Sequence, residues 1–154
     1  MLVLDGRDRR LHFLELYGII TATCCPNCVV FTEASFSRFT LDGGSTPIPA
    51  TLQVKEIEDY VGEDGRKELT ANVFVLGQAP VPLFYGAGSE DLNTIGGFAN
   101  WIQDWQYITC PDCGKPMQYL AQIQWDTVQD CAEGTLYIEF CPDCHIASMH
   151  HQQT

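Results

Sequence analysis

The sequence predicts a mainly β fold built from hairpins, with a zinc-ribbon-like four-cysteine knuckle pair and little helix. Three observations lead to this prediction: short runs that alternate apolar and polar residues, glycine- and proline-rich connectors between them, and two copies of Cys-Pro-Asp-Cys, starting at Cys110 and Cys141. The chain has 154 residues, of which 45% are hydrophobic and 18% are charged. This length and composition suit a single mainly β domain over residues 1–154 with its own core.

The first half, residues 1–85, is expected to form a sub-lobe of hairpins around Cys25 and Cys28. Residues 11–20 and 29–41 have strand-like patterns and flank the turn CCPNC. The runs TLQVKEIEDYV and LTANVFVL have similar patterns and flank GEDGRK, which is rich in turn-forming residues. The pattern therefore predicts two strand pairs, each closed by a short turn.

The second half, residues 86–154, is expected to be the zinc-ribbon-like sub-lobe. It opens with a glycine-rich loop, GAGSEDLNTIGG, followed by a helical turn within FANWIQDW. The runs MQYLAQIQW and TLYIEF alternate apolar with polar residues, which predicts two strands with one face in the core. His150 and His151 are expected to lie at an exposed chain end.

Two Cys-x-x-Cys turns can aim four sulfurs at one point, which is the tetrahedral arrangement of structural Zn²⁺ sites. Cys113 and Cys141 are separated by 27 residues, and the two strand-like runs between them would form a hairpin that returns the second turn to the first. His145 replaces Gly114 in the second turn and is expected to be a packed side chain. The alternative is four reduced thiols packed as small hydrophobic groups. The predicted ligands of one structural Zn²⁺ are Cys110, Cys113, Cys141 and Cys144.

Four further cysteines allow a second metal site. Only Cys25 and Cys28 have knuckle spacing, so the other ligands would come from elsewhere, and His12 or His150 could replace one sulfur. A redox pair of Cys25 with Cys28 is the weaker alternative, because a strand-like context lacks the helix N-terminus that activates such thiolates. The candidate second set is Cys24, Cys25, Cys28 and Cys131.

The charge of the chain favours a basic protein partner. The formal net charge is −12, from 20 acidic and 8 basic residues, and such a surface repels nucleic-acid phosphates and anionic membranes. The alternative is an acidic rim that only keeps the protein soluble. Neither a signal peptide nor a long apolar run is evident, so we expect a cytoplasmic protein with reduced cysteines. The candidate partner-binding acids are Glu56, Glu58, Asp59 and Asp64.

Residues 95–126 and 134–154 resemble the YwqG-like family of bacterial proteins. The shared motifs are Gly-Gly-x-x-x-Trp-x-Gln, a strand containing Leu-Ala-Gln-Ile, and Gly-x-Leu-Tyr, and they cover about the last 60 residues. The resemblance implies a mainly β fold and an interaction role, related distantly to the C-terminal region of programmed cell death protein 2, and it brings no reaction. We expect GGFANWIQ and LAQI to meet around a shared core, where glutamines satisfy backbone groups. The motif residues are Gly96, Gly97, Trp101, Gln103, Leu120, Ala121, Gln122, Gly134, Leu136 and Tyr137.

The sequence carries no standard catalytic motif: Gly-x-Ser-x-Gly, a Walker loop and His-Glu-x-x-His are all missing from it. The predicted function is therefore a non-catalytic, zinc-binding protein-interaction module. In its sharper form it is an acidic inhibitor or immunity-type protein that neutralises a basic partner. Two alternatives stay open, a metal-dependent enzyme of unknown substrate and a purely structural subunit of a larger complex.

Overall fold

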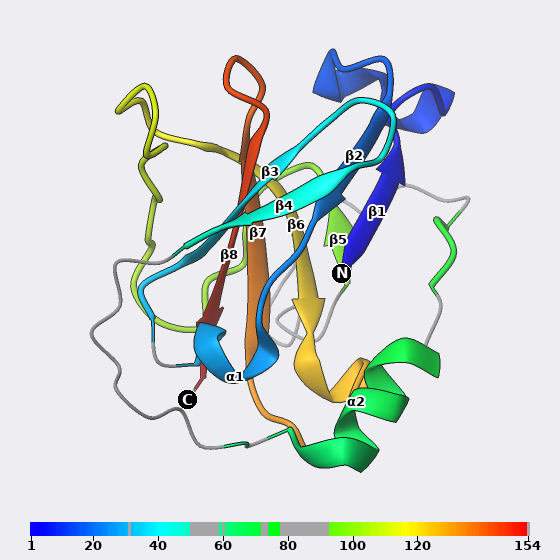
Figure 1. Ribbon diagram of the computed structural model, residues 1–154, viewed down its shortest axis with the longest axis vertical. Coiled ribbons are helices and arrows are strands. Elements are labelled where there is room, and N and C mark those ends of the chain that lie inside the picture. Colours follow the sequence, from blue (N-terminus) through cyan, green and yellow to red (C-terminus); the bar gives the residue numbers. More distant parts are fainter. Residues whose placement is uncertain (31, 50–58, 60, 72–73, 78–92, 154) are drawn as a thin grey trace.

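The computed structural model describes residues 1–30, 32–49, 59, 61–71, 74–77 and 93–153. The predicted mainly β fold is confirmed (Figure 1). Within the described residues, no helix has the length and apolar character needed to cross a membrane.

A six-stranded antiparallel sheet forms the body of the protein (Figure 1). Its strands are β3 (Ser35–Phe39), β4 (Ser45–Ile48), β5 (Thr94–Ile95), β6 (Gln118–Gln124), β7 (Thr135–Cys141) and β8 (Ile146–Gln152). They lie in the order β4-β3-β8-β7-β6-β5. Strand β8 therefore joins the two halves of the chain, because it pairs with β3 on one side and with β7 on the other.

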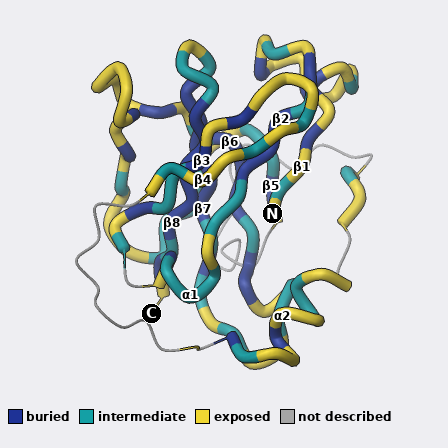
Figure 2. Tube along the Cα trace, in the orientation of Figure 1, coloured by how far each residue is buried: buried dark blue, intermediate teal, exposed yellow. Residues whose placement is uncertain are grey.

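One face of this sheet is apolar and packs under a separate ribbon of two antiparallel strands, β1 (Leu2–Asp5) and β2 (Ile19–Ala22). On the sheet, Ile138 lies opposite Met149 and Phe140 lies opposite Ala147. These side chains form one buried cluster with residues of the ribbon and of β3. Figure 2 shows the buried strands at the centre, with β4 and the second helix largely exposed.

The opposite face of the sheet is polar yet also buried, and we call its side chains the polar layer. Segment 96–109, which has no regular secondary structure beyond one bridge residue, crosses this face. Since a segment of this kind cannot satisfy its own backbone groups, it needs donors and acceptors from the sheet below. The members of the polar layer are Gln122, Thr135, Tyr137, Glu139, Ser148, His150 and Gln152, each less than 5% exposed.

The expectation of a hairpin around GEDGRK is wrong. The expected turn and the start of the expected second strand belong instead to helix α2 (Gly62–Ala71). Lys67 lies 3.2 Å from both Glu63 and Asp64, one helical turn earlier, and such pairs support a helix. Gly65 suits close packing rather than a turn, since a Cβ there would come within 2.8 Å of Gln129 Nε2. The first expected strand, residues 51–61, lies almost wholly outside the described residues.

Two other short helices replace parts of the expected strands. The 3-10 helix η1 (Arg9–Leu14) occupies the start of the run LHFLELYGII, and α1 (Pro26–Val29) follows Cys25. Asp8 caps η1 by accepting the backbone N–H of Arg10 at 2.9 Å. The helical turn expected within FANWIQDW is wrong: residues 98–105 contain only bends.

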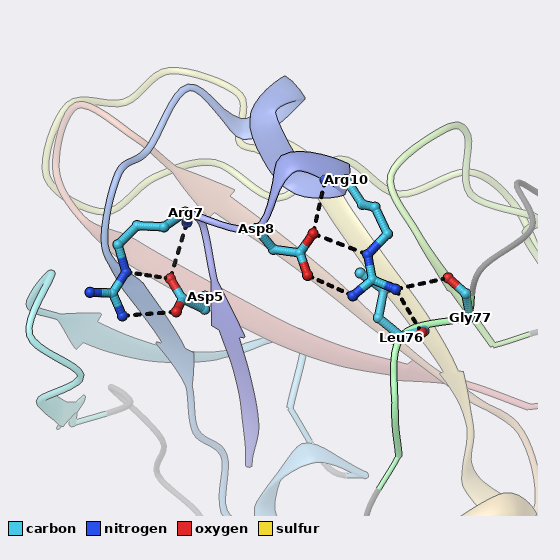
Figure 3. Close-up of polar contacts among 6 residues, drawn as sticks. All are labelled: Asp5, Arg7, Asp8, Arg10, Leu76 and Gly77. Atoms are coloured by element: carbon cyan, nitrogen blue, oxygen red, sulfur yellow. Dashed lines mark hydrogen bonds and ion pairs between the residues drawn. The ribbon is translucent and has the colours of Figure 1, made fainter.

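The side chain of Arg10 connects η1 to residues 74–77 (Figure 3). Its guanidinium pairs with both carboxylate oxygens of Asp8 and donates to the carbonyl oxygens of Leu76 at 2.9 Å and Gly77 at 3.2 Å. Arg7 pairs with Asp5 nearby in the same manner. These exposed ion pairs contribute little energy individually, so we regard them as positioning the chain around the Leu76 side chain, which packs against the core.

The predicted strands β6 and β7 are present, but buried side chains lie on both of their faces and not on one alone. Strand β6 has a register irregularity between Tyr119 and Ala121, which breaks the strict alternation of its sequence. Leu120 and Gln122 are both completely buried, on opposite sides of the sheet's central region. Gln122 therefore belongs to the polar layer rather than to a solvent-facing side, whereas Gln118 at the start of the strand is exposed.

The expectation of an exposed chain end around His150 is also wrong. His150 belongs to β8 and is 1% exposed, because β8 is a central strand of the sheet. His151 points to the other face, where its ring lies edge-on to Trp125 with centroids 4.9 Å apart.

Candidate metal centre

Two similar turns carry the cysteines of the repeated motif. In the first, the backbone N–H of Gly114 donates to the carbonyl oxygen of Cys110 at 2.9 Å, and Cys110 N–H donates to Lys115 O at 2.9 Å. Gly114 has φ of 70°, a left-handed conformation that glycine adopts without strain. His145 occupies the matching place in the second turn with φ of 53°, so both turns reverse the chain after their second cysteine in the same way.

The four sulfur atoms of these turns converge. Each lies within 4.8 Å of every other, and the sulfurs of Cys113 and Cys141 are 3.8 Å apart. A tetrahedron with metal–sulfur bonds of about 2.3 Å has sulfur–sulfur edges of about 3.8 Å. The donor set therefore fits a single tetrahedrally coordinated metal ion. It consists of Cys110, Cys113, Cys141 and Cys144.

The hairpin between the turns brings them together, as the sequence predicted. Strand β6 leaves the first turn and β7 returns to Cys141, with Gln118 opposite Phe140 in the register. Strand β8 then begins at Ile146, directly after the second turn. The cluster is thus held by three neighbouring strands of the sheet, with Cys110 and Cys141 buried and Cys113 exposed.

Charged side chains connect the turns to each other and to the sheet. Lys115 in the first turn pairs with Asp143 in the second at 2.8 Å. Arg38 on β3 pairs with Asp112 at 2.8 Å and donates to the carbonyl oxygen of Cys144 at 3.2 Å. Both turns are therefore cross-linked from outside, which orients the cysteines independently of the metal.

The surroundings of the thiols differ in their effect on ionisation. The backbone N–H of Lys115 donates to the sulfur of Cys113 and lowers the pKa of that thiol. Burial, followed by the neighbouring sulfurs, raises the pKa of Cys144 to about 12. Four thiolates packed this closely would require a cation to compensate their charge, and a metal ion bound among them would supply it.

The ring of His145 stacks on Phe39 with centroids 5.3 Å apart. It is not part of the ligand group. It is a packed side chain, in line with its expected role.

The candidate second metal set is not assembled. Within the part of the chain that the structure describes, the side chains of Cys24, Cys25, Cys28 and Cys131 do not form a ligand group. Cys131 is exposed in the turn before β7 with φ of 60°, while Cys24 packs against the apolar core. The histidines weighed as substitutes lie elsewhere, His12 in η1 beside Tyr17 and His150 in the polar layer.

The expectation of a purely strand-like context for Cys25 and Cys28 is wrong. Cys25 is the N-cap residue of α1, Pro26 is the first residue of that helix and Cys28 lies within it. The pair therefore occupies a single helical turn.

Two of the four candidate partner-binding acids, Asp59 and Asp64, lie around the start of α2. Asp59 is already engaged, because Arg66 binds both of its carboxylate oxygens and lowers its pKa to about 2. Asp64 is highly exposed and contacts Lys67. Glu56 and Glu58 lie outside the described residues.

The two segments of the family motif meet, as expected. The backbone N–H of Gly96 donates to Leu120 O at 2.7 Å, and Asn100 N–H donates to Gln122 Oε1 at 2.8 Å. Gln103 also binds the end of the chain, where its side chain donates to the carbonyl oxygen of Gln153. Gly97 has φ of 77°, in the left-handed region, within the bend that follows β5.

The polar layer holds the backbone of segment 96–109, and its members Thr135, Glu139 and Ser148 are not among the site residues that the sequence predicts. The hydroxyl of Tyr137 accepts Ile102 N–H at 3.0 Å and donates to Asn100 O at 2.6 Å, while Glu139 Oε2 accepts Ile108 N–H at 2.9 Å. Burial raises the pKa of Glu139 to about 7. The sequence does contain a signal for this layer, since polar residues recur at every second position of β7 and β8. The same pattern is typical of a strand face exposed to solvent, so the sequence alone does not show that this face is buried.

Comparison with known proteins gives one relative of unassigned role. The chain is 34% identical over 111 residues to the "Uncharacterized protein YpfL" of Salmonella typhimurium. The match covers 68% of this chain but 24% of the relative, so the chain spans about a quarter of that protein's length. No protein-family model matches the chain, and no solved structure matches it. The resemblance to the YwqG-like family therefore stays a prediction.

Proposed function

We propose that the protein is a non-catalytic interaction module whose fold is stabilised by one structural Zn²⁺ at Cys110, Cys113, Cys141 and Cys144. The convergence of the four sulfurs within 4.8 Å carries this proposal. Zinc is favoured among metals because four cysteine thiolates in tetrahedral geometry are its commonest structural shell.

A structural role for the metal follows from the number of its ligands. Catalytic zinc sites have three protein ligands and keep one position for water or substrate, whereas four thiolates fill the tetrahedron. The ion pairs of Lys115 with Asp143 and of Arg38 with Asp112 support the same role, since they fix the turns.

The surface of the module suits a basic protein. The formal net charge of −12 favours encounter with a cationic partner through long-range attraction. Trp105 and Tyr107 on segment 96–109 are 73% and 57% exposed, and their rings meet edge-on with centroids 5.5 Å apart. Exposed aromatic residues of this kind are common anchors in interfaces. An acidic inhibitor or immunity-type protein in the cytoplasm, where thiols stay reduced, has these properties.

Capture from the native host tests the partner. Wild-type protein is compared with a variant carrying Glu63→Lys and Asp64→Lys, two exposed acids of α2. We expect to capture a basic protein. In purified form it should associate more slowly with the variant than with the wild type, and more slowly at high salt than at low salt. The variant loses the exposed pairs with Lys67, which are individually weak, so its unfolding temperature should fall only slightly. A partner of acidic or neutral charge, or equal association rates for both baits, would contradict the proposal.

A structural role within a larger protein is the second candidate. It is favoured because the matching region is about a quarter of the Salmonella relative. In that case the exposed rings of Trp105 and Tyr107 would pack against other domains, and Trp105→Ala would weaken a contact within one protein or complex rather than the capture of a free basic partner.

A further inference from the structure

The turn from Cys24 to Cys28 contains a second group of thiols, outside the metal centre. The backbone N–H groups of Cys28 and Val29 both donate to the carbonyl oxygen of Cys25 at 3.0 Å, which closes one helical turn. Residues three apart in such a turn have Cα atoms about 5 Å apart. Disulfides form at Cα separations of about 4.4 to 6.8 Å, so the backbone already holds Cys25 and Cys28 at a suitable distance.

The three thiols of this turn have different surroundings. Cys25 is exposed and Cys28 is half-buried, whereas Cys24 packs against the apolar core. Burial, followed by interaction with the Cys25 thiol, raises the pKa of Cys28 to about 11. The exposed and the half-buried sulfur are therefore neighbours, and Cys24 is the packed one.

We propose that Cys25 and Cys28 form a reversible disulfide by exchange with a small-molecule disulfide such as glutathione disulfide. Cys25, as the exposed thiol, loses its proton and attacks one sulfur of glutathione disulfide, which releases one glutathione thiol and leaves a mixed disulfide. Cys28 then attacks the Cys25 sulfur, and the second glutathione leaves as a thiol with the proton that Cys28 gives up. Two protein thiols are oxidised and one glutathione disulfide is reduced to two thiols.

This pair is chemically separate from the metal centre. All four cysteines of the metal centre belong to one other ligand group, in which metal binding would occupy the thiolates. Of the remaining cysteines, Cys131 is three residues before Gly134 in an exposed turn and Cys24 is adjacent to Cys25 in sequence. The proposal does not depend on the interaction role of the module.

The disulfide would affect the contacts that hold the start of α2 against the Cys25–Cys28 turn. Asn27 lies between the two cysteines, where its side chain accepts Val61 N–H at 3.0 Å and donates to Asp59 at 2.9 Å. Asp59 in turn binds Arg66 of α2. Closing the ring around Asn27 restricts the residue that anchors this helix, so oxidation is expected to change the protection of α2 amides from hydrogen exchange.

The test is differential alkylation of the metal-loaded protein after incubation with glutathione disulfide at neutral pH. Free thiols are first alkylated with one reagent, the first label. The disulfides are then reduced, and the thiols that this releases are alkylated with a different reagent, the second label. In the tryptic peptide of residues 11–38, we expect the first label on Cys24 and the second on Cys25 and Cys28, so that two of the eight thiols of the chain are oxidised. Cys131→Ser is the matched control for an exposed thiol elsewhere and should leave this result unchanged.

Three variants check the assignment. Cys25→Ser and Cys28→Ser should each lose the paired second label, while Cys24→Ser should keep it. Three results would overturn the proposal. All thiols could stay free, Cys25 could keep a glutathione adduct without forming the disulfide with Cys28, or the disulfide could involve Cys24. The wild-type label positions decide the matter even where a variant fails to fold.

Discussion

Tyr137 lies directly opposite His150 in the register of β7 and β8, and their rings stack with centroids 5.4 Å apart. Trp101 covers both rings, at 4.5 Å from Tyr137 and 5.7 Å from His150. The imidazole is thus enclosed by aromatic surface, and neither of its nitrogens has a hydrogen-bond partner among the described residues. Such a site disfavours the charged form of histidine.

The first prediction concerns pH. Burial lowers the pKa of His150 to about 4, so the folded protein holds this ring neutral while the unfolded chain protonates it near pH 6.5. Stability from this group is complete above the unfolded pKa and is lost as pH falls from about 6.5 to about 4, on the order of 3 kcal/mol in full. His150→Phe should remove this loss in denaturant melts.

The comparison must be made as variant minus wild type across pH 4 to 8. The raised pKa of Glu139 has the opposite effect, because that carboxyl stabilises the fold at low pH and loses this contribution as pH rises toward about 7. His151 also has a lowered pKa through burial. The wild type and His150→Phe share both of these contributions, so they cancel in the difference. If the free energy of unfolding changes with pH equally in both proteins, the imidazole of His150 is not held neutral.

The second prediction concerns the metal. Purified protein should contain one equivalent of zinc, and Cys113→Ser should unfold or nearly unfold the domain, because apparent zinc-binding energies of about 10 kcal/mol rival the whole stability of a domain. Metal analysis and thermal melts measure both. Cys131→Ser, at an exposed position outside the cluster, should retain zinc and melting temperature. Metal-free protein with an unchanged melt would refute the site.

The third prediction separates a packed from an exposed tryptophan on segment 96–109. Trp101→Ala should lower the free energy of unfolding by about 3 kcal/mol, since it removes the ring that covers Tyr137 and His150. Trp105→Ala should change it by less than about 0.5 kcal/mol, because that side chain is 73% exposed. Urea titrations of both variants provide the measurement; equal losses would mean that the two rings have equivalent roles.

The fourth prediction concerns the polar layer. Gln122→Leu should cost about 1 to 3 kcal/mol, because it leaves the backbone N–H of Asn100 without its acceptor in a buried place. Gln118→Leu is the matched control, on the same strand but exposed. If the two leucine variants are equally stable, then segment 96–109 is not held by the glutamine.

The sequence was sufficient for the features that depend on local spacing. Each Cys-Pro-Asp-Cys turn is defined by adjacent residues, and the length of the β6–β7 hairpin determines where Cys141 returns, so the metal centre could be predicted. The sidedness of the sheet could not. Gln122 and Glu139 have the pattern of solvent-facing residues, and only the position of segment 96–109 above them reveals why they are buried.

Contacts distant in sequence account for the other errors. GEDGRK contains two glycines typical of a turn, but Gly65 packs against Gln129 and makes a helix compatible with the fold. Residues 146–152 contain two histidines and a glutamine, and their central position in the sheet depends on pairing with β3, more than a hundred residues earlier. Neither partner is apparent from the local pattern.

The position of β8 has a consequence for how the protein is made. During translation, β3 and β4 leave the ribosome long before the strand that unites them with β6 and β7, so the central hydrogen bonds of the sheet must wait for residue 152. Until then β3 has an unpaired edge, which is the kind of surface that recruits foreign strands. Pairing between strands so far apart in sequence is slower than the closing of a local hairpin, so this edge stays open longest during folding.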